Sequence, residues 1–387
     1  MNIIVAPDSF KGSLTALEAA DAIIQGVRAV MPEAEIVSVP LADGGEGTVE
    51  ALVRATEGKM RQTEVTGPMG EPVKAIWGLL GDDVTGVVEM AQAAGLSLAP
   101  PEKRNPLVAT THGVGELMLA ALGAGCKQLI VGLGGSATSD GGAGMAQALG
   151  VHLLGPGGVE LKRGAAPLLE LERIDLSRRD PRIAQTTIYA ASDVTNPLCG
   201  PEGAAAVYGP QKGATPEMVD VIDRALGHLG QVIEEQLGIE VREMAGAGAA
   251  GGLGAGLVAF AGAQIRSGPS LVLQLLNFQE FLESADLVLT GEGKLDRQME
   301  FGKALSGVAL LAERHDVPVI AFTGCLEEEQ EKLVEWGIQA VVPITPGPMG
   351  EAEAIAHASE LLQAAAERAM RLVALGRRLG DGRWLGG

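Results

Sequence analysis

Short apolar runs alternate along the chain with stretches whose apolar residues follow the 3.6-residue period of a helix, and this rhythm predicts an α/β fold. Near the N-terminus the pattern predicts strands and helices, in order, at residues 3–6, 15–30, 35–40 and 48–56. After residue 285 we expect strands at 287–290, 317–323 and 341–344, between helices at about 303–314, 327–336 and 351–375. The two early strands and the three late strands would complete one five-stranded parallel sheet.

The middle of the chain has a different pattern. Three consecutive strand-like runs with turns between them predict an antiparallel meander at 62–66, 73–80 and 86–91. Beyond it we expect, in order, a helix at 113–124, a strand at 128–133, a helix at 141–149, a strand at 187–191 and a helix at 215–237. We therefore interpret the chain as a discontinuous α/β domain, residues 1–56 and 266–387, with a second α/β domain, residues 57–265, inserted into it. Two domains in sequence are the alternative, but they would leave the first domain with only two parallel strands.

The composition limits the kinds of partner. A formal charge of −20 over 387 residues repels nucleic acid and anionic lipid, so we expect neither a nucleic-acid partner nor a membrane. The apolar stretch 246–263 is short and has no flanking anchors, which favours a buried helix over a membrane span. Three cysteines far apart in the sequence, and no signal-peptide pattern, indicate a reducing and cytoplasmic environment.

Four predicted strand-to-loop junctions combine glycine with charged or hydroxyl side chains. Loops at the carboxyl ends of parallel strands converge on one crevice, so we expect these junctions to lie together. The first holds Asp8, Ser9 and Lys11, and a lysine beside helix N–H groups makes an anion site, although a plain capped turn is the alternative. The second reads DGGEGT: its glycines permit close approach of a ligand, and Asp43 and Glu46 are candidate oxygen ligands of Mg²⁺.

The third and fourth junctions carry more polar groups. The third, residues 132–144, reads GLGGSATSDGGAG and offers consecutive N–H groups and hydroxyls that suit phosphate oxygens. It is not a Walker A loop, because GxxxxGK[ST] occurs nowhere in the sequence. The fourth follows the strand predicted at 287–290 and gathers Glu292, Lys294 and Asp296 in one loop.

Two further loops add candidates, and several other classes of protein lose support. Asp193 comes just after the strand predicted at 187–191, which suits a base or a metal ligand, and Lys212 adds a cation in a loop. GxSxG is absent, which disfavours a hydrolase, and no GxGxxG follows the first strand, which disfavours an NAD-dependent dehydrogenase. A nucleotide- or solute-binding α/β protein without catalysis would explain the glycine loops but not four acid-bearing junctions.

Taken in order, six motifs resemble the type I glycerate kinase family: PDSFKGSL, PLADGGEGT, GLGGSATSDGGAG, SDVTNPLCG, AVYGPQKGA and LTGEGKLDRQ. The resemblance implies a flavodoxin-like α/β domain with a second α/β domain inserted into it. It also implies a kinase that phosphorylates D-glycerate with ATP and Mg²⁺, usually to 2-phosphoglycerate. Lys294 stands where the family commonly has arginine, Met299 where threonine is expected, and Leu305 where proline is expected. These departures bear on fine specificity rather than on the reaction.

On this hypothesis each candidate residue has a role in phosphoryl transfer. The third loop binds the phosphates of ATP, with glycerate as the alternative occupant, through Gly134, Gly135, Ser136, Thr138 and Ser139. Asp8, Ser9 and Lys212 join the substrate- and phosphate-binding set, and Lys11 and Lys294 neutralise the substrate carboxylate or the transferring phosphoryl group.

The candidate base for the attacking hydroxyl is Asp193, because a carboxylate fixed at the end of a strand can be held close to the hydroxyl proton. Asp43, Glu46 and Asp296 are the expected Mg²⁺ ligands or alternative bases. We expect the active site in a cleft between the two domains, with glycerate and ATP as partners, and a homodimer stays open.

Overall fold

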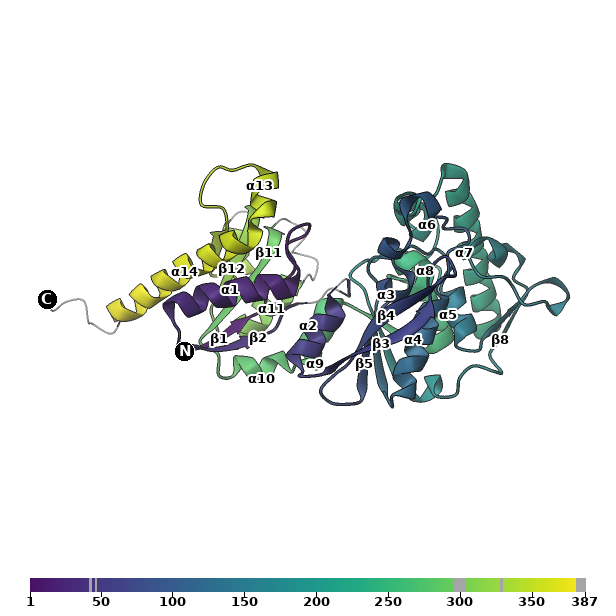
Figure 1. Ribbon diagram of the computed structural model, residues 1–387, viewed down its shortest axis with the longest axis horizontal. Coiled ribbons are helices and arrows are strands. Elements are labelled where there is room, and N and C mark those ends of the chain that lie inside the picture. Colours follow the sequence, from purple (N-terminus) through teal and green to yellow (C-terminus); the bar gives the residue numbers. More distant parts are fainter. Residues whose placement is uncertain (42–43, 46, 296–303, 328–329, 381–387) are drawn as a thin grey trace. The chain divides into compact units, whose positions relative to one another are not determined.

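The computed structural model describes residues 1–41, 44–45, 47–295, 304–327 and 330–380, so the predicted metal ligands Asp43, Glu46 and Asp296 lie outside the described residues. The chain forms two compact units, one made of Met1–Ala42 with Pro269–Gly387 and the other of Asp43–Gly268 (Figure 1). The domain boundaries near residues 56 and 266 stay predictions.

The first unit contains a five-stranded, entirely parallel sheet with the order β13-β12-β11-β1-β2. Counted along the chain, this is the 2-1-3-4-5 order of flavodoxin-like folds. The prediction of one parallel sheet built from the two ends of the chain is therefore confirmed. Its strands are β1 (Asn2–Val5), β2 (Glu35–Ser38), β11 (Leu287–Leu295), β12 (Val319–Leu326) and β13 (Ala340–Pro343).

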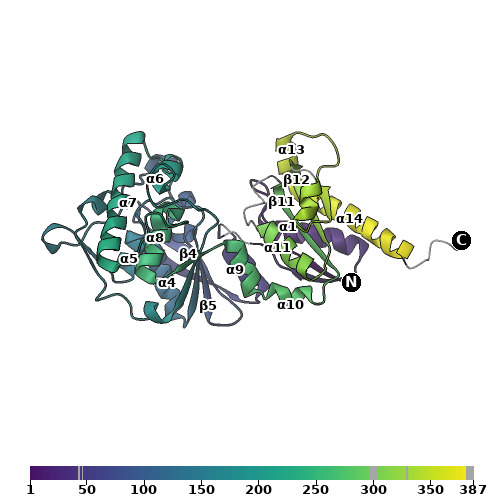
Figure 2. The same cartoon turned by 180° about the vertical axis from the view of Figure 1, so that it is seen from behind.

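Helices cover both faces of this sheet. Figure 1 shows α1 and α14 side by side on one face, and Figure 2 shows α11 on the other. A Cβ atom at Gly26 of α1 would lie 2.4 Å from the carbonyl oxygen of Gln363 in α14, so glycine allows the two helices to pack closely. The helices are α1 (Ala16–Val30), α9 (Gly268–Leu275, whose first residue belongs to the other unit), α10 (Phe278–Leu282), α11 (Ala304–Arg314), α12 (Gln330–Glu335), α13 (Glu351–Ala356) and α14 (Ala358–Gly380).

Local sequence signals explain where α1 begins. The Thr15 side chain accepts a hydrogen bond from the Glu18 amide at 3.2 Å, and the Glu18 carboxylate accepts from the Thr15 amide at 2.8 Å. This reciprocal capping box satisfies two amides that the helix leaves unpaired. The single helix predicted over 351–375 is wrong, because the structure has two helices that break at His357.

The second unit has a six-stranded mixed sheet with the order β10-β9-β6-β5-β4-β3. The strands β3, β4 and β5 are antiparallel neighbours, which confirms the predicted meander, and β5, β6, β9 and β10 run parallel. The strands are β3 (Lys59–Thr66), β4 (Pro72–Leu79), β5 (Thr85–Glu89), β6 (Gln128–Gly132), β9 (Thr187–Ala191) and β10 (Gln264–Arg266), and β7 (His152–Leu154) pairs separately with β8 (Arg173–Asp175).

The two faces of this sheet pack against different helices. Trp77 and Leu79 of β4 join the main core of the unit together with residues of α4 and α8. Gly78, between them, faces α2 so closely that a Cβ atom there would lie 2.5 Å from Val53. The helices are α2 (Thr48–Ala55), α3 (Ala91–Ala94), α4 (His112–Gly123), α5 (Ala143–Ala148), α6 (Ala204–Tyr208), α7 (Pro216–Leu237) and α8 (Ala249–Ala261).

Short 3-10 turns complete this unit, at Leu96–Leu98, Pro101–Lys103, Pro156–Gly158, Ala166–Glu170, Ile183–Gln185 and Pro210–Lys212. The helix α8 is buried along nearly its whole length, which confirms the interpretation of its apolar, glycine-rich sequence as a core helix. Among the described residues, no helix combines the length and the apolar character needed to cross a membrane.

Candidate active site

In the first unit, the Asp8 junction and the glycine-rich end of β11 lie together. The Asp8 amide donates to the Gly291 carbonyl at 2.8 Å, and a Cβ atom at Gly293 would lie 3.3 Å from the backbone nitrogen of Lys11. The loop predicted for residues 291–295 is wrong, because β11 continues to Leu295, where it still pairs with β12. Lys294 therefore projects from a strand and not from a flexible loop.

The charged side chains at this edge differ in burial. Lys11 and Lys294 are exposed, whereas Glu292 is 9% exposed. The Lys294 ammonium lies 2.8 Å from the Glu327 carboxylate, and both side chains are about half exposed, at 49% and 53%. A pair this exposed contributes only ~0–1 kcal/mol, so an anionic ligand can compete with Glu327 for Lys294. Asp8 accepts a hydrogen bond from the Ser9 amide at 2.6 Å, which orders the start of the loop.

In the second unit, four parallel strands end at the same level. Glu89, Gly132, Ala191 and Arg266 are register partners across β5, β6, β9 and β10. The amide of Leu133, just after β6, donates to the Ala191 carbonyl at 3.1 Å. The amide of Ser192, just after β9, donates to the Arg266 carbonyl at 2.9 Å. The loops after these strands therefore leave one edge of the sheet together, as expected for the carboxyl ends of parallel strands.

The DGGEGT loop packs onto this edge through glycine backbones. The Gly134 amide donates to the Gly44 carbonyl at 3.2 Å. A Cβ atom at Gly132 would lie 2.4 Å from the Gly44 oxygen, and a Cβ atom at Gly134 would lie 2.6 Å from the Gly45 Cα atom. No side chain fits at these two positions without displacement, so Gly132 and Gly134 are required by their contact with Gly44 and Gly45.

The loop 132–144 has an accessible outer part. Gly135 is exposed, and Gly134 and Ser136 are half-buried. Two backbone hydrogen bonds fix this part to the segment where α3 ends and the 3-10 turn Leu96–Leu98 begins. The Leu96 amide donates to the Gly135 carbonyl at 2.8 Å, and the Ala137 amide donates to the Ala94 carbonyl at 2.9 Å. A rigid loop with accessible glycine and serine suits an anionic ligand, because its backbone donors are held in place before the ligand arrives.

The inner part of the same loop is closed to solvent. Thr138 and Ser139 are fully buried, and neither hydroxyl has a hydrogen-bond partner in the described part of the chain. Lys212 is 1% exposed, and its ammonium donates to the Thr138 carbonyl at 2.6 Å. These three predicted ligand contacts thus lie behind the loop surface, and their direct contact with a ligand stays a prediction.

Asp140 is a buried carboxylate that the sequence analysis did not select. One oxygen accepts from the Thr111 amide at 2.8 Å, the Thr111 hydroxyl at 3.0 Å and the Gly144 amide at 3.1 Å, and the other accepts from the Gly142 amide at 3.2 Å. Burial raises the pKa of Asp140, while these hydrogen bonds act to lower it. Asp140 thereby connects the start of α4 to the start of α5.

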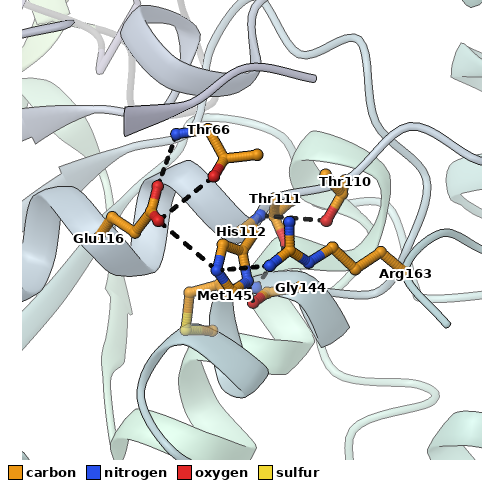
Figure 3. A network of polar contacts seen from close by, with 8 residues as sticks. All are labelled: Thr66, Thr110, Thr111, His112, Glu116, Gly144, Met145 and Arg163. Carbon is orange, nitrogen blue, oxygen red and sulfur yellow. Dashed lines mark hydrogen bonds and ion pairs between the residues drawn. The ribbon is translucent and has the colours of Figure 1, made fainter. Parts of the chain in front are cut away.

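A polar network continues from this point to the surface (Figure 3). The Thr111 hydroxyl accepts from the Met145 amide at 2.9 Å, and His112 Nδ1 lies 3.2 Å from the Gly144 carbonyl. Arg163 lies 2.9 Å from His112 Nε2, and because a guanidinium can only donate, this nitrogen must accept. His112 is therefore neutral with its proton on Nδ1, and burial together with the charge of Arg163 lowers its pKa.

Two more acids lie at the carboxyl edge of the six-stranded sheet. Asp193 is exposed, and its Oδ1 accepts from the Gly268 amide at 3.2 Å. Glu89, the last residue of β5, is 2% exposed, and its carboxylate accepts from the Val49 amide at 2.7 Å in the first turn of α2. The sequence analysis missed Glu89, although a lone acid that ends an apolar strand was a usable signal.

Comparisons with known proteins identify the family. The family model described as the glycerate kinase family matches residues 3–374. The chain belongs to the glycerate kinase family. It is 51% identical over 364 residues to glycerate kinase from Halalkalibacterium halodurans, covering 94% of this chain and 96% of the relative. It is 49% identical over 344 residues to glycerate 2-kinase from Escherichia coli, covering 89% of this chain and 90% of the relative.

A solved structure agrees with the sequence relatives. The crystal structure of a Salmonella typhimurium LT2 protein assigned as glycerate kinase 2 matches with a TM-score of 0.87 at 46% identity, over 98% of this chain and 99% of that one. The resemblance stated from the six motifs is thus confirmed, and the chain is an enzyme of the kinase class.

Metal ligands in this glycerate kinase family member remain predictions. Over the ranges that the structure describes, no group of three histidine, cysteine, aspartate or glutamate side chains is arranged to hold a metal ion. The predicted ligands Asp43, Glu46 and Asp296 lie outside those ranges.

Proposed function

We propose that this enzyme transfers the terminal phosphoryl group of ATP to glycerate and forms 2-phosphoglycerate. Relatives named glycerate kinase and glycerate 2-kinase, at 51% and 49% identity, support the substrate and the product. The observation that carries the proposal is the contact between Gly44–Gly45 and Gly132–Gly134 at the carboxyl ends of parallel strands. Phosphoryl transfer depends mainly on positioning and charge neutralisation, and backbone donors on a rigid glycine loop supply both.

In this proposal the accessible part of the loop 132–144 binds phosphate oxygens of ATP. Gly134, Gly135 and Ser136 are the residues that a ligand can reach. The loop is fixed on two sides, by the DGGEGT glycines and by residues 94–96, so little ordering is needed when a ligand binds. Glycerate in the same place stays the alternative.

Lysines of the first unit neutralise charge in the proposed reaction. Lys11 is exposed beside the backbone of Gly293, and Lys294 forms an exposed ion pair with Glu327. A carboxylate or a phosphoryl group carries the negative charge that these ammonium groups would bind. Asp8 and Ser9 belong to the same loop and stay candidate substrate contacts.

Asp193 is the proposed base for the attacking hydroxyl, since it is exposed two residues after the end of β9. Mg²⁺, held by Asp43, Glu46 or Asp296 together with phosphate oxygens, would neutralise charge on the phosphates. A cleft between the two predicted domains, a cytoplasmic location and a homodimer stay predictions of the sequence analysis.

The test is ADP formation that requires the protein, D-glycerate and Mg²⁺ together. We expect no ADP without glycerate and none in excess EDTA. Asp193→Asn should lower kcat about 10²–10⁴-fold if Asp193 is the base. Asp220→Asn, on the exposed side of α7, is the matched control and should match the parent. ATP binding without glycerate-dependent turnover would favour the non-catalytic alternative, and an Asp193→Asn variant within tenfold of the parent would refute the assigned base.

A further inference from the structure

We propose that Asp140 and Lys212 are a buried positioning pair, which holds the loop 132–144 in its ligand-binding shape without touching the ligand. The link to catalysis rests on the proposed function, because it requires that this loop binds a phosphate or a substrate carboxylate.

The first support is the position of Lys212. Its side chain is among the largest fully buried side chains of the described residues, at 1% exposed, and its ammonium donates to the Thr138 carbonyl at 2.6 Å. Thr138 lies two residues after Ser136, the last accessible residue of this part of the loop, and is itself fully buried. Lys212 therefore contacts the loop from its inner side, through the backbone, where no solvent-borne ligand reaches it.

The second support is the position of Asp140. Its four hydrogen bonds come from Thr111 at the start of α4 and from Gly142 and Gly144 at the start of α5. Gly142 has a φ of +76°, which favours glycine, and its amide is directed at the carboxylate. Asp140 thus fixes the far end of the loop, while Lys212 fixes its middle.

Charge connects the two residues. A buried ammonium is costly unless an opposite charge compensates for it, and the carboxylate of Asp140 is the charge that stabilises protonated Lys212. Arg104 lies beside Gly213, but its guanidinium is directed at the carbonyls of Ala99 and Leu96, at 3.0 and 3.4 Å. Burial lowers the pKa of Lys212 to about 7, which agrees with incomplete compensation.

The environment of the loop shows why such a pair is needed. The hydroxyls of Thr138 and Ser139 have no hydrogen-bond partner among the described residues, so side-chain bonds do not hold this segment. Gly251 packs against it so closely that a Cβ atom there would lie 2.0 Å from the Thr138 oxygen. The Thr138 carbonyl is therefore held between a glycine backbone and the ammonium of Lys212, and loss of the ammonium would release it.

The experiment measures hydrogen exchange of the loop and steady-state kinetics on the full chain. Lys212→Met removes the charge, Lys212→Arg keeps a charge that does not titrate, and Lys162→Met, at an exposed lysine, is the matched control. We expect Lys212→Met to speed amide exchange in peptides covering 132–144 and to lower kcat/KM, each about 10–100-fold. Lys162→Met should stay within about twofold of the parent, and Lys212→Arg should recover most of the loss.

The parent protein gives an independent reading that needs no variant. The folded pKa of Lys212 is lowered to about 7, so opening that exposes this side chain takes up a proton. Protection of the loop, corrected for intrinsic exchange, should therefore rise at least about tenfold between pH 7 and pH 9, and Lys212→Arg should remove this rise. If Lys212→Met does not fold, protection that stays constant with pH in the parent overturns the proposal by itself. A folded Lys212→Met with unchanged loop exchange also overturns it, and a raised KM in that protein would indicate direct ligand contact.

Failure of the proposed function has a different signature. A parent protein that forms no ADP with glycerate and Mg²⁺ refutes the proposed reaction, whereas the exchange measurements still decide whether Asp140 and Lys212 hold the loop.

Discussion

Replacing Asp140 with asparagine changes one atom at the point where four hydrogen bonds meet. Three donors converge on one carboxylate oxygen, and the Gly142 amide donates to the other. An asparagine that keeps its oxygen at the first position retains those three bonds. Its NH₂ group then faces the Gly142 amide, so two donors oppose each other in a site with no solvent access.

The cost follows from these contacts. An unsatisfied buried donor costs ~1–3 kcal/mol. Removing one partner of a buried pair of opposite charges costs ~3–5 kcal/mol, a range that already includes the cost of an unsatisfied donor. In Asp140→Asn the charge left without its partner is that of Lys212. We therefore expect Asp140→Asn to lower the free energy of unfolding of the second unit by about 3–5 kcal/mol. At ~2–4 °C per kcal/mol for a unit of this size, the midpoint should fall by about 6–20 °C.

Tryptophan fluorescence can follow this unit selectively. Trp77 is 3% exposed in β4, and replacing Trp336 and Trp384 with phenylalanine leaves it as the sole tryptophan of the chain. Guanidinium unfolding of Asp140→Asn in this background is compared with Asp220→Asn, an exposed aspartate on α7. A change below about 1 kcal/mol at constant m, equal to that of the control, would refute the reasoning.

Three further predictions concern the same unit. Gly134→Ala should raise the KM for ATP about tenfold, because its Cβ would lie 2.6 Å from Gly45, whereas Gly123→Ala, with open space around it, should match the parent in the same kinetic assay. The pKa of Lys212 is lowered from 10.5 to about 7 in the folded chain, so unfolding takes up a proton between these pH values. Denaturant titrations should therefore show the free energy of unfolding rising by about 2 kcal/mol from pH 7 to pH 9, and this rise should be absent in Lys212→Met. The pKa of His112 is lowered below its ordinary 6.5, so the stability that neutral His112 contributes is lost as the pH falls below that value. His112→Gln should therefore reduce the fall in the free energy of unfolding below pH 6.5. An unchanged fall would contradict the assignment of His112 as neutral.

Periodicity predicted the sheets because strand and helix spacing are local properties. Residues 3–6 and 287–290 were each predicted as buried strands. Because strands that alternate with helices form a parallel sheet, we predicted one sheet for both, and they pair in parallel. The meander was equally visible, since turn residues punctuate its strands. The strands β7, β8 and β10 have only three residues each, which is too short for an alternating pattern to be recognised.

Other features depend on partners far away in the sequence. The glycines at 291 and 293 suggest a loop, but pairing with β12 keeps this segment extended through Leu295. Asp140 bonds to a residue 29 positions away, and Glu89 bonds to one 40 positions away. Their roles as buried acceptors follow from tertiary contacts, which a pattern of neighbouring residues does not contain.

The most direct test of phosphoryl transfer to glycerate is the phosphorus NMR spectrum of ATP, Mg²⁺ and D-glycerate incubated with the protein. We expect the γ-phosphate signal of ATP to decrease while a phosphomonoester signal coupled to the proton on carbon 2 of glycerate grows, with neither change when glycerate is omitted. A spectrum in which ATP stays intact, or in which it yields only inorganic phosphate, would contradict the proposed reaction.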